Sequence, residues 1–351
     1  ESKAGIRQHA KNAYEQLGLP RLIIIAFLLS LFALAVIMRM DLAILVKDSI
    51  TRIGMNGILV LAMLPTLACG VGLNFGLPVG VIAGLVGAVT SMNWGLKGFA
   101  GFAAAMAIAI PLAVIAGYLY AMLLERVQGQ EMMVGTYVGF SLVSGMCMFW
   151  LLAPYRNPAM IFALGGKGLR TTITLDRTFG KVLNDFLGFS ILDVYIPTGL
   201  LLFMGVFYVA IALFFKSKAG LAMRTVGSNP MYARSSGINV QGMRTLGVIL
   251  STVLAAIGIL VYSQSYGFVQ LYTAPLTAAF PAVASVLIGG ASLRKATIGH
   301  ALLGTVLFHT LLTIALPVTQ TVLQGADISE IARMIMSNGM IIYALTRAER
   351  R

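Results

Sequence analysis

The sequence predicts an all-α, polytopic membrane protein with about ten transmembrane helices, some of them broken or re-entrant. Of its 351 residues, 58% are hydrophobic and only 11% are charged, whereas soluble domains carry about 25% charged residues. Apolar runs close to the length that crosses a bilayer recur along the whole chain. The 38 glycines are typical of spanning helices that approach one another closely. We therefore expect residues 1–351 to form a single transmembrane domain.

Ten apolar runs account for the predicted spans. They are residues 22–39, 53–70, 71–92, 98–124, 131–152, 198–215, 244–264, 276–291, 297–316 and 328–346. Pro65 and Pro78, with several glycines between them, predict broken helices where the second and third runs meet. Residues 265–282 fit either a short half-helix or a re-entrant turn. The first run follows a basic tail and lacks a cleavage site of small residues, so it is predicted to be a retained span and not a signal peptide.

The net charge of +13 does not indicate nucleic-acid binding, because the basic residues lie between apolar runs and not on one face. Lys and Arg instead collect on the cytoplasmic side of membrane proteins. Ten spans with both termini in the cytoplasm place most of the Lys and Arg inside. This topology leaves two long connections, an external loop at 153–197 and a cytoplasmic loop at 216–243. Within the external loop, Ile191–Ile196 is predicted to lie flat on the membrane.

The cytoplasmic loop contains the signals for a short, isolated helix. Asn229 is a residue type that caps helix starts, and Pro230 is favoured at the first helical position. Gly237 suits the left-handed conformation that ends a helix. The pattern predicts a helix of about two turns at Pro230–Ser236, with Asn239 as the cap of the next span. Because so short a helix is marginal alone in water, it must pack against either a cytoplasmic partner or its own membrane domain.

Two blocks of sequence resemble the simple-sugar and nucleoside permeases of the ABC superfamily, the ribose-permease-like group. The first block, Gly227–Val240, is similar to the family pattern G-x-N-P-x-A-A-R-x-x-G-I-N-V, except that Tyr232 replaces an alanine. The second block, Val286–Leu293, is similar to the family's V-I-G-G-x-S-L, and glycines follow it as in the family. The N-terminal half resembles the family less closely, since Asn74 stands where the family has an acidic residue.

The resemblance implies the membrane-spanning subunit of an ATP-driven importer in the bacterial inner membrane. Such permeases pair with an identical copy or a sister permease, and work with two cytoplasmic ATPase subunits and an external solute-binding protein. ATP and Mg²⁺ belong to the ATPase, and no cofactor is expected on this chain, whose sequence has no G-x-x-x-x-G-K-[ST] phosphate loop. The implied solute is a simple sugar, with a nucleoside as the alternative. The residues that the resemblance assigns to ATPase coupling are Gly227, Asn229, Pro230, Tyr232, Ala233, Arg234 and Gly237.

Polar residues inside the predicted spans are the candidates for the solute path, because a polar group at membrane depth tends to face a cavity or a partner. Asn74 lies at a helix break, where it either lines the path or forms a hydrogen bond between helices. Phe75 either stacks on a sugar or base ring or packs in the core. The remaining candidates are Asn56, Thr136, Tyr137 and Ser141.

Two other classes of function fit the sequence less well. An intramembrane enzyme needs clustered nucleophiles, metal ligands or paired carboxylates, but no G-x-S-x-G or H-E-x-x-H motif occurs. His300 and His309 have no Cys or carboxylate at metal-ligand spacing, so we expect structural histidines and no metal site. A self-sufficient secondary transporter usually carries a charged residue near the middle of a span for ion coupling, and these spans are nearly free of charge.

Overall fold

The structure of the protein is a computed structural model. It describes residues 19–323 except 128, 156, 163–167, 192–193 and 293–294, together with residues 334, 338 and 339. The predicted tenth span, 328–346, therefore lies almost entirely outside the described residues.

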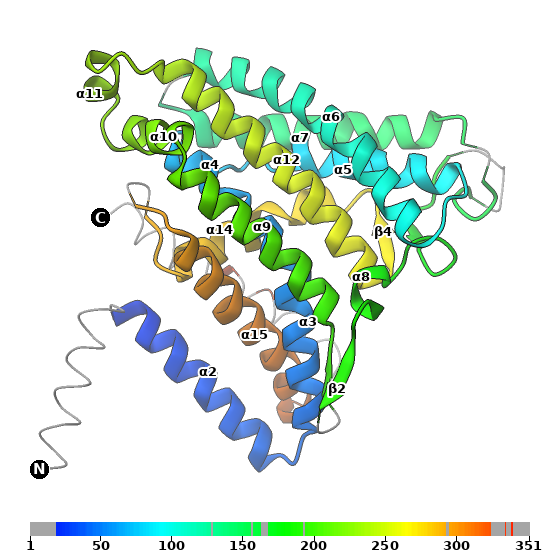
Figure 1. Cartoon of the computed structure of the whole chain (residues 1–351). Coiled ribbons are helices and arrows are strands. Elements are labelled where there is room, and N and C mark those ends of the chain that lie inside the picture. Colours follow the sequence, from blue (N-terminus) through cyan, green and yellow to red (C-terminus); the bar gives the residue numbers. More distant parts are fainter. Residues whose placement is uncertain are drawn as a thin grey trace, which may run out of the picture.

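The described chain is mostly helical (Figure 1). The long helices and their neighbours are α2 (Leu19–Ile37), α3 (Leu42–Leu61), α4 (Met63–Ala68), α5 (Pro78–Asn93), α6 (Gly98–Arg126), α7 (Glu131–Leu152), α9 (Thr198–Lys216), α10 (Lys218–Ser228), α12 (Val240–Tyr266), α14 (Ala279–Ile288) and α15 (Ile298–Leu323). Three short helices are α8 (Val182–Asp185), α11 (Pro230–Ser235) and α13 (Ala274–Thr277). The strands are β1 (Thr172–Thr174), β2 (Phe189–Ile191), β3 (Val194–Ile196) and β4 (Phe268–Gln270).

Most of the predicted spans coincide with apolar helices. Among the described residues, six helical segments are long and apolar enough to cross a membrane: Leu42–Ala68, Gly98–Arg126, Glu131–Leu152, Thr198–Lys216, Val240–Tyr266 and Ile298–Thr321. Shorter apolar helices at Leu22–Ile37, Pro78–Asn93 and Ala274–Ile288 coincide with three further predicted spans. The polytopic, mostly helical architecture is confirmed, and the number of ten spans stays a prediction.

The predicted start of the second span at residue 53 is wrong, because α3 begins at Leu42. Asp41 caps this helix, and its carboxylate accepts a hydrogen bond from the backbone N–H of Ala43 at 2.9 Å. The predicted run leaves out the charged residues Lys47, Asp48 and Arg52, but all three are exposed on a helix whose other face is buried. A spanning helix can extend beyond the hydrocarbon layer, so charges in its first turns do not mark its end.

The predicted break between the second and third runs is present. α4 ends at Ala68 and α5 begins with Pro78 at its first turn. Gly70 and Gly72 lie between them with φ of 75° and 100°, backbone conformations that glycine adopts without steric cost. The chain thus reverses inside the bundle through glycine-rich backbone instead of a continuous helix.

An entirely α-helical fold was expected, and the structure corrects this with two small antiparallel sheets. β1 pairs with β4, which joins the 153–197 connection to the segment after α12. β2 pairs with β3, so residues at both ends of Ile191–Ile196 belong to a two-stranded sheet, and the position of this segment on the membrane stays a prediction. The segment predicted as a half-helix or re-entrant turn at 265–282 contains β4, α13 and the start of α14. Each strand has three residues, too few for sequence alternation to reveal.

Close approach of small residues holds the central helices together. Gly80 and Gly84 lie where α5 crosses α12, and a Cβ on Gly80 would overlap the carbonyl oxygen of Thr252. Helices in lipid associate mainly through packing and interhelical hydrogen bonds, so such backbone contact is a main source of cohesion. A second apolar cluster joins α2 to α15 through residues that include Leu31 and Phe308.

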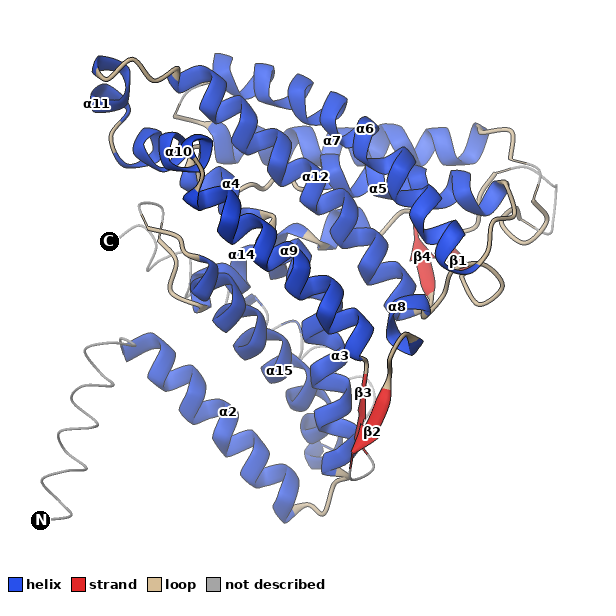
Figure 2. Cartoon of the chain, in the orientation of Figure 1, coloured by secondary structure: helices blue, strands red, loops and turns tan. Residues whose placement is uncertain are grey.

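The two long connections lie at opposite ends of the helix bundle. α10 and α11 stand at one end, whereas α8 and the strands lie at the other, as Figure 2 shows. This arrangement agrees with one connection on each side of a membrane. We refer to the two ends as the α11 end and the β end.

Candidate functional site

The helix predicted at Pro230–Ser236 is present as α11, which is one residue shorter. The side chain of Asn229 caps it, with Oδ1 accepting a hydrogen bond from the backbone N–H of Tyr232 at 3.0 Å. Gly237 has a φ of 78°, the left-handed conformation expected after a helix end. Asn239 caps α12 in the same way, accepting from the N–H of Gly242 at 2.9 Å. α10, at Lys218–Ser228, was not predicted.

α11 has one buried face and one open face. Ala233 is fully buried against the rest of the chain. Met231 is 79% exposed and the neighbouring Tyr232 is 62% exposed. Methionine and tyrosine are enriched in protein interfaces, and two of them exposed side by side on a helix form an apolar patch. The helix therefore packs on α10 and on the neighbouring α12, with Ala233 buried, and leaves Met231 and Tyr232 exposed.

The C-terminal end of α10 is in direct backbone contact with the break between α4 and α5. A Cβ on Gly227 would overlap the carbonyl oxygen of Ala68, and a Cβ on Gly70 would lie 3.0 Å from the Cα of Gly227. No side chain separates these two stretches of backbone. Because packed interiors are nearly incompressible, a displacement of the end of α10 toward the break must also displace the break.

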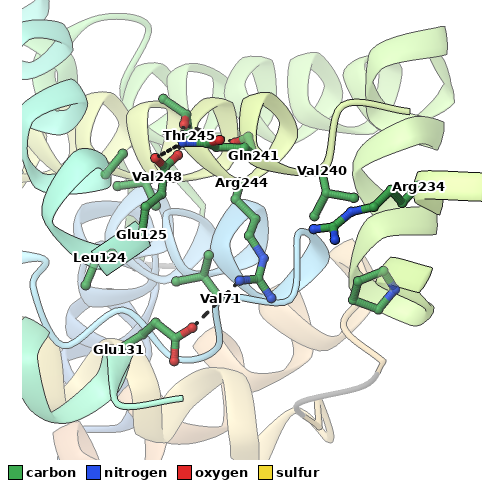
Figure 3. A pocket seen from close by; sticks show the side chains of 12 residues that line it. Val71, Leu124, Glu125, Glu131, Arg234, Val240, Gln241, Arg244, Thr245 and Val248 are labelled. Carbon is green, nitrogen blue, oxygen red and sulfur yellow. Dashed lines mark hydrogen bonds and ion pairs between the residues drawn. The ribbon is translucent and has the colours of Figure 1, made fainter. Parts of the chain in front are cut away.

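A cavity of about 220 Å³ lies between α11 and the ends of α6, α7 and α12. Its lining includes Glu125, Glu131, Arg234, Gln241, Arg244 and Thr245. Figure 3 shows the side chain of Arg234 pointing from α11 toward this cavity and toward Arg244. Among the residues assigned to coupling by resemblance, Arg234 thus faces the membrane domain, whereas Tyr232 faces outward.

Polar contacts around this cavity tie three helices together. Glu125, at the end of α6, accepts hydrogen bonds from Thr245 Oγ1 at 2.7 Å and from the side-chain amide of Gln241 on α12. Arg244 on α12 lies 3.8 Å from the carboxylate of Glu131 at the start of α7. Sequence reasoning did not single out these contacts as a site, because they join residues more than one hundred positions apart. Their only sequence signal is a pair of acidic residues at the ends of two predicted spans.

Replacing the cap of α11 gives a first testable prediction. We expect Asn229→Ala to destabilise α11 by about 1 kcal/mol, because the backbone N–H of Tyr232 loses its acceptor. Amide hydrogen exchange in residues 230–236 should then become about fivefold faster in the isolated permease. Ser235→Ala is the matched control, since Ser235 is exposed and its hydroxyl bonds only the carbonyl of Tyr232. Unchanged exchange in Asn229→Ala would contradict the capping role.

Asn74 lies at the break and is 3% exposed. Its Nδ2 donates a hydrogen bond to Ser251 Oγ on α12 at 2.8 Å. Its Oδ1 accepts a hydrogen bond from the hydroxyl of Tyr120 on α6 at 3.2 Å. The amide thus joins three segments, and it does not line the cavity beside α11. Of the two roles considered from the sequence, this geometry corresponds to a hydrogen bond between helices.

The other candidates from the break and from α7 lie on two elements in contact. The ring of Phe75 packs 5.8 Å from that of Phe280, centroid to centroid. Gly139 of α7 would place a Cβ 3.4 Å from the carbonyl oxygen of Phe75. Thr136 is part-buried, and its hydroxyl donates to the carbonyl of Met132 in its own helix. Two further α7 candidates are exposed on the outside of this chain, namely Tyr137 and Ser141.

Asn56 lies apart from these residues. It is part-buried on α3, and its Nδ2 donates to the carbonyl of Arg52 at 2.9 Å. It lines a second cavity, between α3, α12, α14 and α15, which none of the other candidates touches.

Parts of this chain are similar in sequence to known proteins. The nucleoside ABC transporter permease NupC of Lactococcus lactis subsp. cremoris strain MG1363 is 47% identical over 51 residues, 14% of this chain and 16% of that protein. The autoinducer 2 import system permease LsrC of Yersinia enterocolitica is 29% identical over 188 residues, 52% and 49% of the two chains. The guanosine ABC transporter permease NupQ of Bacillus subtilis strain 168 is 31% identical over 97 residues, 28% and 30% of the two. These matches span half or less of each relative, and no solved structure matches the chain.

The family pattern covers much more of the chain than the individual relatives do. A family described as "Branched-chain amino acid transport system / permease component" matches residues 22–345, from α2 to beyond α15. The resemblance to ABC permeases predicted from Gly227–Val240 and Val286–Leu293 is confirmed by this match and by the three relatives. The chain belongs to the family of permease components typified by the branched-chain amino acid transport system.

Proposed function

We propose that the chain is the membrane-spanning subunit of an ATP-binding-cassette importer that moves a small, neutral, hydroxyl-rich solute into the cytoplasm. Membership of a permease family supports the transport role. The relatives are named for nucleosides, guanosine and autoinducer 2, which supports a simple sugar or a nucleoside as the solute class. The permease acts in the bacterial inner membrane, paired with an identical copy or a sister permease.

The open face of α11 is the observation that carries this proposal. A helix of six residues is marginal alone, yet here it is capped, packed against α10 and α12 with Ala233 buried, and left with Met231 and Tyr232 exposed. The exposed side chains of Met231 and Tyr232 form a preformed surface that can bind in a groove on a partner. The partner is a cytoplasmic ATPase, which binds ATP and Mg²⁺. The α11 end and both termini then face the cytoplasm, and the external solute-binding protein docks at the β end.

The contact between Gly227 and the helix break provides a route for coupling. When ATP draws the two ATPase subunits together, each moves the α11 helix that is docked on it. The direct backbone contact between Gly227 and Gly70 carries this displacement to the segment between α4 and α5. A rigid-body change of this kind switches the solute path between inward-open and outward-open states, and ATP hydrolysis resets it.

Replacing the exposed side chains of Met231 and Tyr232 tests the proposal. The permease is purified from cells that co-express its cognate ATPase, as wild type and as the double variant Met231→Ser with Tyr232→Ser. We expect the double variant to retain at most about a tenth of the ATPase, because central apolar residues carry most of the energy of an interface. Its thermal unfolding midpoint should stay unchanged, since both side chains are exposed.

The matched control replaces a methionine and a tyrosine of similar exposure on the membrane helices. Met148 is 67% exposed and Tyr118 is 51% exposed, and their double serine variant should retain the ATPase. Full retention of the ATPase by the Met231→Ser, Tyr232→Ser variant would contradict the docking role of α11. Solute uptake by the permease alone in vesicles without ATPase would instead favour a self-sufficient secondary transporter.

A further inference from the structure

A cavity of about 180 Å³ opens between α3, α12, α14 and α15. Its polar lining comprises Arg52, Asn56, Gln270, Thr277 and His309. Arg52 and Asn56 lie on α3, Gln270 lies on β4, and His309 lies near the middle of α15. Since β4 belongs to the β end, the cavity extends from that end of the bundle toward its centre. It is thus separate from the cavity behind α11.

Several polar groups in this cavity have unused hydrogen-bonding capacity. His309 is only 6% exposed, and its buried Nε2 has no hydrogen-bond partner among the described residues. Within the same part of the chain, the exposed guanidinium of Arg52 and the side-chain amide of Gln270 also form no hydrogen bond or ion pair. A buried polar atom without a partner destabilises the empty site, so a ligand that supplies the missing hydrogen bond binds more tightly, by about tenfold.

The remaining polar side chains contribute oxygen acceptors. The Nδ2 of Asn56 donates to the carbonyl of Arg52, which leaves Oδ1 free to accept. The hydroxyl of Thr277 donates to the carbonyl of Thr273, which leaves its lone pairs free. The lining therefore offers both donors and acceptors, with Arg52 as the strongest donor. Tyr262, Ile259 and Pro281 add apolar surface between these groups.

This chemistry selects among classes of solute. A hydroxyl group both donates and accepts, so a ring with several hydroxyls matches a mixed lining, whereas an anion requires donors alone. An amino acid or another ammonium ligand needs a carboxylate partner, and no Asp or Glu lines the cavity among the residues that the structure describes. The volume is smaller than the roughly 300 Å³ at which drug-sized pockets begin, and so suits a small solute.

We propose that this cavity is a binding site for a neutral, polyhydroxylated ring, held by Arg52, Asn56, Gln270 and His309 at the β end of the permease. The assignment rests on the proposed importer function only in taking this ring to be the transported solute. The site receives the solute at the end of the bundle opposite to α11. Solute bound here lies beside α12 and α14, and it moves onward when these helices shift.

Direct binding to the full-length permease in lipid nanodiscs tests the site without ATP or any partner. The probes are radiolabelled D-ribose and guanosine, with L-leucine as a comparator of the amino-acid class. We expect saturable binding of at least one hydroxylated probe and no saturable binding of leucine. Asn56→Leu and Gln270→Leu should each weaken binding about tenfold, the factor that corresponds to one lost hydrogen bond.

Two threonine variants are the matched controls. Thr51→Val on α3 and Thr313→Val on α15 each remove a hydroxyl that bonds only within its own helix, outside the cavity lining. Both should bind the probe within about twofold of wild type. Because the side chain of Gln270 forms no hydrogen bond with the described residues, its variant should fold normally even if a variant of buried His309 does not.

Wild-type affinity in Asn56→Leu and Gln270→Leu would overturn the site, as would saturable binding of leucine alone. A lack of saturable binding of both hydroxylated probes would also overturn the assignment. Retention of the ATPase by the same preparations is measured separately. A permease that holds its ATPase but fails these binding tests would refute the cavity assignment and leave the importer function standing.

Discussion

Gly304→Ala is expected to destabilise the permease by about 3 kcal/mol, the upper range for inserting a methyl group into a packed site. Gly304 lies where α15 crosses α14, and a Cβ on it would overlap the carbonyl oxygen of Ser285. The contact is reciprocal, because a Cβ on Gly289 would overlap the carbonyl oxygen of His300. Backbone lies on both sides of this crossing, so no side chain can rotate away, and the two helices must separate. In lipid no hydrophobic effect between the helices compensates for lost packing.

The thermal unfolding midpoint in nanodiscs is the measurement, and Gly304→Ala should lower it by roughly 5 °C or more. Gly205→Ala is the matched control, because a Cβ on this glycine of α9 would meet nothing within 4 Å. Since alanine favours a helix over glycine by about 1 kcal/mol, Gly205→Ala should leave the midpoint unchanged or raise it. An equal, small effect of both substitutions would show that α14 and α15 are not in direct backbone contact at Gly304.

The long helices could be predicted from the sequence because the length of an apolar run is a local property. The segments predicted at 98–124 and 131–152 are helices at Gly98–Arg126 and Glu131–Leu152. α11 could also be predicted, since its cap at Asn229 and its terminating Gly237 are defined by residues within the helix itself or next to it. One of the two blocks that carry the family resemblance, Gly227–Val240, contains this helix.

Features that depend on tertiary contacts could not be predicted in this way. The first turns of α3 carry charges that separate them from the apolar run after residue 53, and only the structure shows that the helix includes them. β1 pairs with β4 across almost one hundred residues, and Thr245 bonds Glu125 across 120 residues. The cavity at the β end brings Asn56 together with His309, and no spacing rule in the sequence relates these two residues. The prediction that Asn74 and Asn56 belong to one solute path is untested, and the two residues lie in different surroundings.

A substitution at Asn74 separates its two possible roles. We expect Asn74→Leu, which keeps a similar volume, to destabilise the permease by about 2 kcal/mol. Ser251 is fully buried and Tyr120 is 5% exposed, so the hydroxyls that contact Asn74 have no access to water as a replacement partner. Thr136→Val is the matched control, because the hydroxyl of Thr136 bonds only within its own helix. That variant should shift the unfolding midpoint much less.

A double-mutant cycle between Asn74→Leu and Tyr120→Phe then measures the contact itself. If Asn74 joins the helices, the two substitutions should couple by about 1 kcal/mol, because either one alone already breaks the hydrogen bond between them. The KM for solute uptake, measured on the folded fraction in proteoliposomes, should stay within about twofold of wild type. If Asn74 lines the solute path, we expect the opposite pattern. KM should then rise about tenfold, the unfolding midpoint should stay unchanged, and the coupling energy should be near zero. Asn74 replaces a residue that is acidic in the resembling permeases, and this pair of measurements decides whether the replacement changes the solute path or only the bond that holds the break to α6 and α12.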